Sequence, residues 1–426
     1  NLICRGIVMD TMTIHTIDLI QIFIHGVIDM NVFQPDFVSD EYFIVKYFLK
    51  GKTSLKSAAW NLAIGQSIGN PNNRSVWETE QMFKDHSCII MADETYLSSV
   101  KEGVVNIAFP LANLNLEEDG ISQILCHIAG GQVDILEVEQ CHVLDITLPQ
   151  HIEQQFALKP AHGIDGFRKF SNIHDKPFFG GIIKPKVGMS PVILLEAVKE
   201  MVDGGVNFIK EDELLGDPSH CSLKDRVPLI SNWLAKNAPD VMYTFCINGD
   251  SPYALQRAQF VADEGGLGIH INVWSGLGVY RAIRKQNPNL WIHFQKSGDK
   301  FFTDRRAPNH IYWPVICKIA GWSGSDSIHA GMIGGYMNQD DAELQDALRV
   351  LWQYNVIPAL SCGMHPGLVQ HINGLLGTND WMANVGGALH GHPMGTIAGA
   401  MAMRQSIDGN HEVEYELAIN KWGLKA

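Results

Sequence analysis

The first thing the sequence lacks is any close pairing of its cysteines. None of the eight cysteines among 426 residues forms a Cys-x-x-Cys pair, and most of them lie in apolar runs. Scattered cysteines of this kind are typical of reduced core residues in an intracellular protein. We therefore expect the protein to be cytoplasmic.

Positive charge is also scarce. The chain has 32 lysines and arginines against 46 aspartates and glutamates, which gives a formal net charge of −14 at pH 7. This balance argues against a nucleic-acid partner and against an anionic membrane surface, since both attract basic proteins. An acidic protein that binds an anionic substrate must rely on local lysines, backbone amides and a metal ion.

A long uninterrupted apolar run is missing as well. Residues 11–30 are rich in apolar side chains, but Asp18, His25 and Asp29 interrupt them, and no basic stretch precedes them. The segment therefore predicts neither a membrane-spanning helix nor a signal peptide. The chain does not begin with Met, and residues 1–30 are left unassigned as an N-terminal extension.

Apolar residues make up 46% of the chain, an ordinary share for a globular protein, and the length allows two domains. Residues 31–158 mix strands and helices without a regular alternation. This predicts a smaller α+β domain of ferredoxin-like type, with an antiparallel sheet and helices on one face. Its expected strands are 41–49, 103–110 and 138–148, and its expected helices are 54–65 and 116–129.

From residue 159 to residue 426 the rhythm changes, because strand-like runs alternate with amphipathic helices. Eight strand–helix units in about 250 residues predict a TIM (β/α)8 barrel within an α/β fold class. A doubly wound open sheet is the alternative, but no G-x-G-x-x-G motif opens the first unit. The expected strands are 179–186, 207–212, 240–248, 267–274, 290–296, 326–330, 356–362 and 381–387. The expected helices are 193–203, 223–237, 252–264, 277–286, 309–321, 340–353, 368–376 and 395–407.

The segment 205–213 is an apolar strand that ends in one lysine among three carboxylates. Residues two apart on a strand share a face, so Lys210 and Asp212 point the same way, and Glu213 follows as the strand opens into a loop. Carboxylate oxygens suit Mg²⁺. A lysine with a lowered pKa can add CO₂ and become a carbamate, a third oxygen ligand. The alternative is a structural ion-pair network.

Polar residues gather at the expected strand ends, where barrels carry their chemistry. These ends are Lys184-Pro-Lys186, Lys210-Glu-Asp-Glu213, His293-Phe-Gln-Lys296, Asp326-Ser-Ile-His329, Ser361-Cys-Gly363 and Gly386-Gly-Ala-Leu-His-Gly-His392. The lysines at these ends are too many for a buried structural role, because an unpaired buried charge is costly.

The strand ends also predict two anion sites. Lys296, His329 and Ser361 are candidates for one of them, although a single histidine at a strand end is more often structural. The other lies after strands seven and eight, where glycines let backbone amides approach a phosphate. These glycines are Gly363, Gly386 and Gly387, and each of them alone equally suits a tight turn.

Together these motifs resemble the RuBisCO large-subunit superfamily. The resemblance rests on Gly181-Ile-Ile-Lys-Pro-Lys-Val-Gly188, Gly204-Gly-Val-Asn-Phe-Ile-Lys-Glu-Asp-Glu213, Asp326-Ser-Ile-His-Ala-Gly331, Ser361-Cys-Gly363 and Gly386-Gly-Ala-Leu-His-Gly-His-Pro393. It runs from about residue 33 to the C-terminal region. It implies a small α+β N-terminal domain, an eight-stranded barrel, and a homodimer whose active sites borrow residues from the partner's N-terminal domain.

Carried over position by position, the resemblance implies that Lys210 is carbamylated and binds Mg²⁺ with Asp212 and Glu213. Lys184 is the general acid or base near the substrate's carbonyl carbon, and Lys186 supports the carbamate and the metal. Lys296 stands where the family has an arginine, and it keeps the charge without the bidentate fork. The phosphate-binding positions are Lys296, His329, Ser361, Gly363, Gly386 and Gly387.

Departures from the family pattern fall on the carboxylation machinery. Tyr336 replaces the mobile-loop lysine, and Gly65 replaces its carboxylate partner. Gln295 replaces the active-site histidine of strand five, His127 replaces a substrate-binding asparagine, and Asn70-Pro71 replaces a Thr-Trp phosphate pair. Losing one charge-stabilising group typically costs on the order of 10²–10³ in rate. The pattern therefore resembles the form IV RuBisCO-like proteins, without CO₂ fixation.

The retained groups suit the formation of an enolate, since Mg²⁺ polarises a ketone oxygen while a base removes the α-proton. We expect an enolase, isomerase or decarboxylase that acts on a small phosphorylated keto-sugar or sugar acid. Lys184 would return a proton. Histidine is a common general base, so His127 is a candidate base or a structural helix residue. The alternatives are a true ribulose-bisphosphate carboxylase with an altered lid and a non-catalytic sugar-phosphate-binding barrel.

Overall fold

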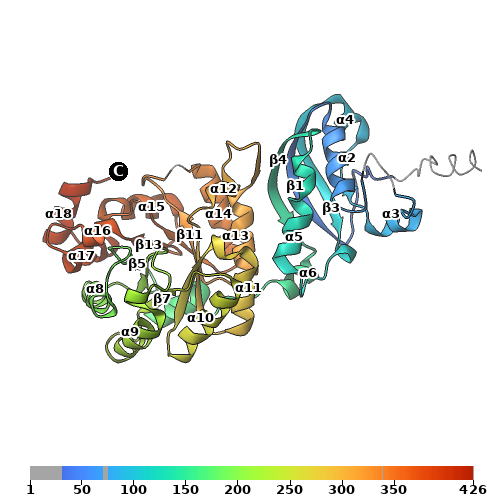
Figure 1. Ribbon diagram of the computed structural model, residues 1–426. Coiled ribbons are helices and arrows are strands. Elements are labelled where there is room, and N and C mark those ends of the chain that lie inside the picture. The colour runs from blue at the N-terminus through green and yellow to red at the C-terminus, as the bar shows by residue number, and fades with distance from the viewer. Residues whose placement is uncertain (1–30, 71–74, 338, 426) are drawn as a thin grey trace, which may run out of the picture. The chain divides into compact units, whose positions relative to one another are not determined.

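The computed structural model describes residues 31–70, 75–337 and 339–425, so the unassigned segment 1–30 and Pro71 lie outside the described residues. The described chain forms two compact units (Figure 1). The first contains the residues up to Asn115 together with Cys126–Cys141, and the second contains Leu116–Leu125 and everything from His142 onward. The boundary predicted between residues 158 and 159 stays a prediction.

The first unit contains β1, β2, β3 and the first residues of β4, which belong to a five-stranded sheet with the strand order β10-β4-β1-β3-β2. Strand β1 pairs antiparallel with β3, and β2 also pairs antiparallel with β3. A parallel bridge between Phe33 and Ile90 makes the sheet mixed, which corrects the purely antiparallel expectation. The strands are β1 (Tyr42–Gly51), β2 (Ile89–Ile90), β3 (Glu102–Pro110), β4 (Val138–Thr147) and β10 (Asn309–Ile311).

Strand β1 alternates buried and more exposed residues, so one face of the sheet carries a core. Helix α2 packs against β1 and β3, and Ser54 caps it by accepting a hydrogen bond from the Ser57 backbone amide. The helices expected at 54–65 and 116–129 are present, whereas α3 and α4 were not predicted. The helices are α2 (Leu55–Gly65), α3 (Glu80–His86), α4 (Glu94–Ser99) and α5 (Gly120–Ile128).

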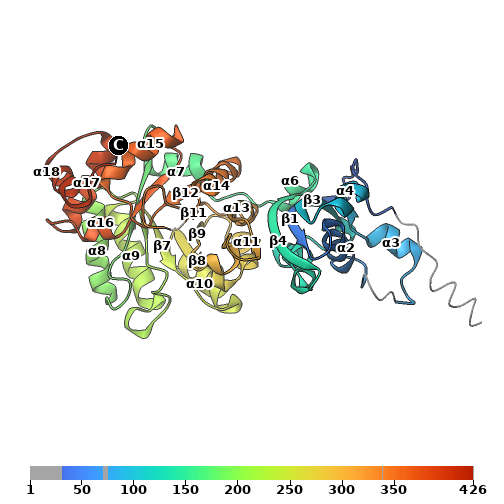
Figure 2. The same cartoon turned by 90° about the horizontal axis from the view of Figure 1, so that it is seen from above.

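The second unit is a closed barrel with strand order β11-β12-β13-β5-β6-β7-β8-β9 (Figure 2). Every neighbouring pair is parallel, which confirms the predicted (β/α)8 barrel and excludes the open doubly wound sheet. The strands are β5 (Phe178–Ile182), β6 (Phe208–Lys210), β7 (Met242–Cys246), β8 (Gly268–Asn272), β9 (Trp291–Gln295), β11 (Ser327–Gly331), β12 (Ile357–Leu360) and β13 (Met382–Val385).

Helices alternate with these strands nearly as expected. They are α6 (Gln150–Phe156), α7 (Gly163–Ser171), α8 (Pro191–Asp203), α9 (Leu223–Asn237), α10 (Ser251–Asp263), α11 (Leu277–Gln286), α12 (Lys300–Thr303), α13 (Trp313–Trp322), α14 (Asp341–Gln353), α15 (Val369–Leu376), α16 (Gly387–His390), α17 (Thr396–Asp408) and α18 (Val413–Trp422). The helix expected at 309–321 begins later, because residues 309–311 form β10 and Pro314 occupies the first turn of α13.

An apolar cluster fills one end of the barrel interior. The first residues of β5, β6, β7 and β9 belong to it, namely Phe178, Phe208, Met242 and Trp291. Phe167 of α7 packs into the same cluster. The N-terminal end of the barrel is therefore a packed core, which leaves the polar inward positions to the C-terminal ends of the strands.

The described part of the chain contains no disulfide bond. All seven cysteines in this part of the chain are free thiols, and five are buried, whereas Cys126 is exposed and Cys362 is half-buried. None of the described helices combines the length and apolarity that a bilayer crossing requires.

Candidate functional site

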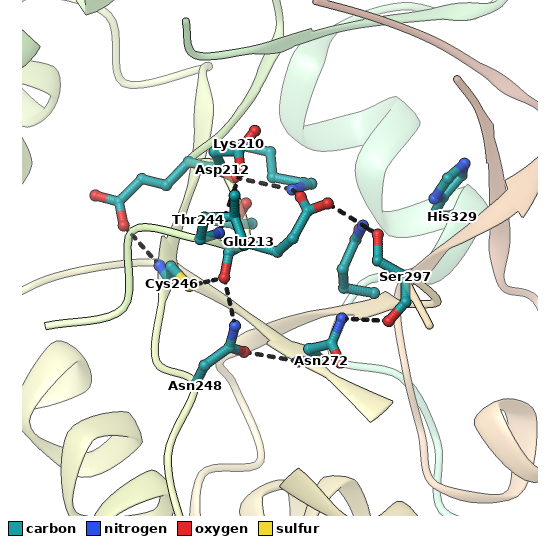
Figure 3. Close-up of polar contacts among 12 residues, drawn as sticks. Lys210, Asp212, Glu213, Thr244, Cys246, Asn248, Asn272, Ser297 and His329 are labelled. Carbon is teal, nitrogen blue, oxygen red and sulfur yellow. Dashed lines mark hydrogen bonds and ion pairs between the residues drawn. The ribbon is translucent and has the colours of Figure 1, made fainter. Parts of the chain in front are cut away.

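Lys210 ends β6 with its side chain inside the barrel. It is only 1% exposed, and its ammonium donates to the Glu211 backbone carbonyl at 2.9 Å and to Glu213 Oε2 at 3.1 Å. Figure 3 shows this lysine and Glu213 facing each other. Because Lys210 has almost no contact with solvent, Glu213 is its principal compensating charge.

Asp212 lies two residues after Lys210 and shares its side of the strand, as predicted. It is also buried, and its Oδ2 atom lies 2.5 Å from the Lys184 ammonium at the end of β5. The Leu214 backbone amide donates to the other carboxylate oxygen. Two neighbouring strands therefore bring a proton-carrying lysine directly against one expected metal ligand.

Glu211, the third carboxylate of the motif, faces the other way and is fully buried. It accepts a bidentate pair of hydrogen bonds from Arg226 at 2.8 and 3.1 Å, one from the Tyr243 hydroxyl and one from the Cys246 backbone amide. All its acceptor positions are used for structure. The motif therefore splits into a structural carboxylate and two that line the barrel mouth.

Glu213 is held at both its side chain and its backbone. Its Oε1 atom accepts a hydrogen bond from the Ser297 hydroxyl at 2.8 Å (Figure 3). Burial raises the pKa of Glu213, but the Lys210 charge, its backbone amide and Ser297 outweigh burial and lower the pKa to about 2. The side chain is therefore a carboxylate at any physiological pH.

Two asparagines at strand ends fix the distance between Glu213 and Ser297. Asn248 donates from its side chain to the Glu213 carbonyl at 2.7 Å, and its own side-chain oxygen accepts from the Asn272 amide at 2.8 Å. Asn272 in turn donates from its side chain to the Ser297 carbonyl at 2.9 Å. This linkage, visible in Figure 3, joins the segments after β6, β7, β8 and β9.

A cavity of about 720 Å³ opens over these residues at the C-terminal ends of the strands. This is a usual size for a small-molecule site. Its lining includes ten of the expected site residues, namely Lys184, Lys186, Lys210, Asp212, Glu213, His329, Ser361, Gly363, Gly386 and Gly387. It also includes Gln295, Ser297, Tyr336, Cys362, His365 and Trp422. The topology thus brings most of the expected cluster together.

His329 projects from β11 into this cavity and is nearly buried. Burial and the nearby Lys296 charge lower its pKa to about 3, so the imidazole is neutral at physiological pH. Its Nε2 atom lies 3.7 Å from the Cys362 sulfur. A neutral imidazole here can accept or donate a hydrogen bond to a bound ligand, but it does not supply a positive charge.

Lys296 does not line the cavity. It is 2% exposed and outside the cavity lining, with its ammonium 4.0 Å from the Trp313 ring centroid and 3.6 Å from Asp299 Oδ2. Alternation along β9 explains this, because Gln295 faces inward and the next residue faces the helix layer. A phosphate-binding role for Lys296 would require its side chain to leave Trp313.

His127 lies near the end of α5 in the first unit and does not line the barrel cavity of this chain. Its Nδ1 atom is 3.2 Å from the Gln66 carbonyl, and the Gln66 side chain donates to the His127 carbonyl at 2.8 Å. These contacts suit the structural interpretation. Its role as a base stays a prediction.

Tyr336 occupies the loop after β11 and is 80% exposed while still lining the cavity. Its backbone amide donates to the Cys362 carbonyl at 3.3 Å, and a Cβ atom at Gly363 would lie 3.0 Å from its ring. Gly363 has a φ of +104°, which favours glycine. An aromatic ring therefore lies beside this glycine of the expected phosphate cradle.

The carboxylate oxygens at the cavity mouth suit a hard divalent cation, but the unmodified side chains supply one ligand fewer than expected. Asp212 and Glu213 provide two carboxylates, and the described residues contain no group of three His, Cys, Asp or Glu side chains that could hold a metal ion. Mg²⁺ prefers more oxygen ligands than a carboxylate pair supplies. A carbamate on Lys210 would supply the third oxygen donor from the protein.

Sequence reasoning missed Ser297, Asn248 and Asn272. The two asparagines stand at or just after the C-terminal ends of β7 and β8, so the rule that selected Lys210 also applies to them. Ser297 carries no motif signal, because its importance depends on which loop folds against Glu213. Gln295 was noted as a departure, but not as a residue that contacts the site.

Comparisons with known proteins agree with this architecture. The model for the ribulose bisphosphate carboxylase large chain, catalytic domain, matches residues 163–421, and the model for its N-terminal domain matches residues 33–152. A ribulose bisphosphate carboxylase from Pyrococcus furiosus is 31% identical over 410 residues, which cover 90% of this chain and 94% of the relative.

Solved structures show the same fold. Octameric ribulose-1,5-bisphosphate carboxylase/oxygenase from Pyrococcus horikoshii OT3 superposes with a TM-score of 0.81 at 26% identity, covering 93% of this chain and 97% of that one. A rubisco-like protein from Burkholderia fungorum superposes with a TM-score of 0.76 at 23% identity, covering 89% and 99%. The chain therefore belongs to the ribulose bisphosphate carboxylase large-chain family.

Proposed function

We propose that this protein is a Mg²⁺-dependent enzyme that forms the enolate of a small phosphorylated keto-sugar or sugar acid. It would act as an enolase, isomerase or decarboxylase and would not fix CO₂. One observation carries the proposal: Lys210, Asp212 and Glu213 line the cavity together with Tyr336, which the family resemblance places at the position of the carboxylases' lid lysine. The groups that remove a proton are retained. The lid lysine, whose positive charge is expected to stabilise a new carboxylate, is missing.

The expected roles follow from the positions. Lys210 as a carbamate, Asp212 and Glu213 would hold Mg²⁺, which when bound supplies electrophilic stabilisation to a substrate ketone oxygen. Lys184 lies at the cavity wall against Asp212 and exchanges a proton with the substrate carbon, and Lys186 adds positive charge at the rim. The substrate phosphate would lie over the backbone amides of Gly363, Gly386 and Gly387, beside the Ser361 hydroxyl.

A true ribulose-bisphosphate carboxylase is the second candidate, because the relative from Pyrococcus furiosus carries that name at 31% identity. A non-catalytic sugar-phosphate-binding barrel is the third. The three candidates differ in what they do to CO₂ and to a carbon-bound proton, so two assays on one preparation separate them.

The first assay supplies ribulose bisphosphate, Mg²⁺ and labelled bicarbonate to the purified protein. We expect no label in acid-stable product, and incorporation that depends on Lys210 would overturn the proposal in favour of carboxylation. The second follows exchange of α-protons in phosphorylated keto-sugars in D₂O by NMR. We expect exchange that Lys210→Ala abolishes. Absence of exchange across the panel would favour the non-catalytic barrel.

The carbamate has its own test. Protein equilibrated with ¹³C-bicarbonate and Mg²⁺ should show one carbamate carbon resonance that is absent from Lys210→Ala. A spectrum without that resonance at saturating CO₂ would contradict the proposed ligand set.

A further inference from the structure

A row of hydrogen-bonding side chains runs through the barrel interior toward Glu213. It begins at Trp291, whose indole Nε1 atom lies 3.2 Å from the Ser327 hydroxyl oxygen. The same oxygen lies 2.8 Å from His293 Nδ1. All three side chains are completely buried, in β9 and β11. No residue of this group belongs to the predicted site.

Only the first of these bonds has a direction fixed by itself, because an indole N–H only donates and Ser327 therefore accepts from Trp291. The Ser327 hydroxyl donates to His293 Nδ1 when the imidazole carries its hydrogen on the other nitrogen. Burial and the Lys210 charge lower the pKa of His293 well below its usual value, so the ring is neutral. A neutral imidazole that accepts at Nδ1 carries its hydrogen on Nε2.

The row continues from His293 to Gln295. His293 Nε2 and Gln295 Oε1 are both buried, and neither has a hydrogen-bond partner among the described residues. The two side chains interact, and this contact raises the pKa of His293 against the larger effect of burial. A ring N–H and an amide oxygen are chemically suited partners, and a hydrogen on Nε2 leaves His293 Nδ1 to accept from Ser327.

The last links reach the mouth. Gln295 donates from Nε2 to the Ser297 hydroxyl at 2.7 Å, and Ser297 donates to Glu213 Oε1 at 2.8 Å. A carboxylate only accepts, so this end is fixed as firmly as the indole end. With the His293 hydrogen on Nε2, every hydrogen in the row points toward Glu213, and the Asn248–Asn272 linkage holds the Ser297 and Glu213 backbones in place.

We infer that Trp291, Ser327, His293, Gln295 and Ser297 form a one-way hydrogen-bond chain that orients Glu213 and sets its affinity for Mg²⁺. The inference rests on the proposed function, because it assigns the chain to the same metal site. Gln295 and Ser297 are positioning residues, since they act through Glu213. Outer partners of a ligating carboxylate typically account for about 10- to 100-fold in metal affinity.

The test measures Mg²⁺ binding by calorimetry at saturating CO₂. We expect Ser297→Ala to weaken binding by about 10- to 100-fold, and Ser297→Thr, which keeps a hydroxyl, to restore most of the affinity. Gln295→Glu is nearly the same size but cannot donate, so the Ser297 hydroxyl turns to residue 295 and binding weakens as in Ser297→Ala. The same change at exposed Gln256 on α10 is the matched control.

The outcomes separate the two proposals. No Mg²⁺ binding by the unaltered protein would overturn the proposed function and this inference with it. Equal affinity in the unaltered protein, Ser297→Ala and Gln295→Glu would overturn the chain alone. A measurement without metal checks the direction of the chain: ¹⁵N NMR should place the His293 hydrogen on Nε2. A hydrogen on Nδ1 would contradict the inference even if a variant failed to fold.

Discussion

Glu211 and Glu213 are two residues apart and have opposite tasks. Glu211 is enclosed by Arg226, Tyr243 and the Cys246 amide, whereas Glu213 faces the cavity and Ser297. Strand alternation alone would place residues two apart on the same face, but β6 ends at Lys210 and the chain then turns, so Glu211 stays behind the barrel wall while Glu213 faces the cavity. The structural carboxylate and its arginine anchor the segment that carries the proposed metal ligands.

Breaking that buried pair should destabilise the fold strongly. Arg226→Met leaves the Glu211 carboxylate buried without its bidentate partner, which typically costs about 3–5 kcal/mol. The free energy of unfolding, measured by urea denaturation, should fall by that amount. Lys199→Met is the control, because it removes a more exposed ion pair with Glu196, and such pairs contribute under about 1 kcal/mol. Equal losses in the two variants would contradict this assignment.

Lys184 should matter for proton transfer rather than for metal binding. We expect Lys184→Met to lower the rate of α-proton exchange by about 10²–10⁴-fold, since a positioned acid or base contributes that much. Mg²⁺ affinity should change far less, because the ammonium approaches Asp212 without being a ligand. Calorimetry and the D₂O exchange assay on the same protein distinguish the two effects. A variant that loses both in parallel would argue for a structural role.

For single residues, the sequence predicts the site members that share a motif. It fails for residues whose place in the site depends on the direction of the side chain. Lys210, Asp212 and Glu213 were predicted because spacing places them at one strand end, and the structure groups them in the cavity lining. Lys296 was expected in the mouth but faces the helix layer, since a shift of one residue along a strand reverses the face. Ser297 could not be predicted, because only the folded loop brings it to Glu213.

Neighbouring strands β4 and β10 bring together two histidines, His142 and His310, whose tilted rings have centroids 4.0 Å apart. Burial, the second ring and Arg305 lower the pKa of His142 to about 4, and burial also lowers that of His310. Between the unfolded value of about 6.5 and pH 4, the unfolded chain binds a proton that the folded chain does not. The stability that this pair contributes is therefore present above pH 6.5 and is lost as pH falls toward 4.

This pair gives a prediction for the pH dependence of stability. His142→Gln should be stabilised relative to the unaltered protein at pH 4.5 compared with pH 7.5, because the proton-linked penalty is removed. The measurement is the urea midpoint of both proteins at the two pH values. His174→Gln, at an exposed position, serves as the control. An unchanged difference between the two pH values would argue against a role for the His142–His310 contact.

Helices and strands could be predicted where the periodic hydrophobic pattern extends over many residues. Short helices and strands were harder to predict. The alternation of strands and helices after residue 159 identified the barrel, because each unit repeats the same burial pattern. Helices α3 and α4 have seven and six residues, too few for a periodic signal. Strand β10 is not separated from the helix in the prediction because it has only three residues, and Tyr312 alone lies between it and α13.

The family resemblance predicts that two copies of this chain form a dimer with shared active sites, and this stays a prediction. Relatives of the same family are described as dimeric in Hyperthermus butylicus and octameric in Pyrococcus horikoshii. By the same resemblance, His127 of the N-terminal domain would serve as the base in the active site of the partner copy. A C₂ dimer would supply it twice, once to each site.

Subunit mixing tests this arrangement. Lys210→Ala and His127→Gln proteins should each be inactive in α-proton exchange. Unfolded and refolded together, they should regain about a quarter of the activity, since half of the dimers are mixed and one site in each mixed dimer is complete. Size-exclusion chromatography with light scattering should show dimers or multiples of dimers throughout. A monomer with full activity would contradict both the assembly and the role of His127.

Trp422 lines the cavity from the C-terminal helix α18, and Lys425 anchors the segment by donating its backbone amide to the Gly367 carbonyl. The molecule thus carries an intrinsic fluorophore at the wall of its own substrate site. The difference in emission between the unaltered protein and Trp422→Phe would report occupancy without any label. A library of sugar phosphates can be screened through this signal before the reaction is known.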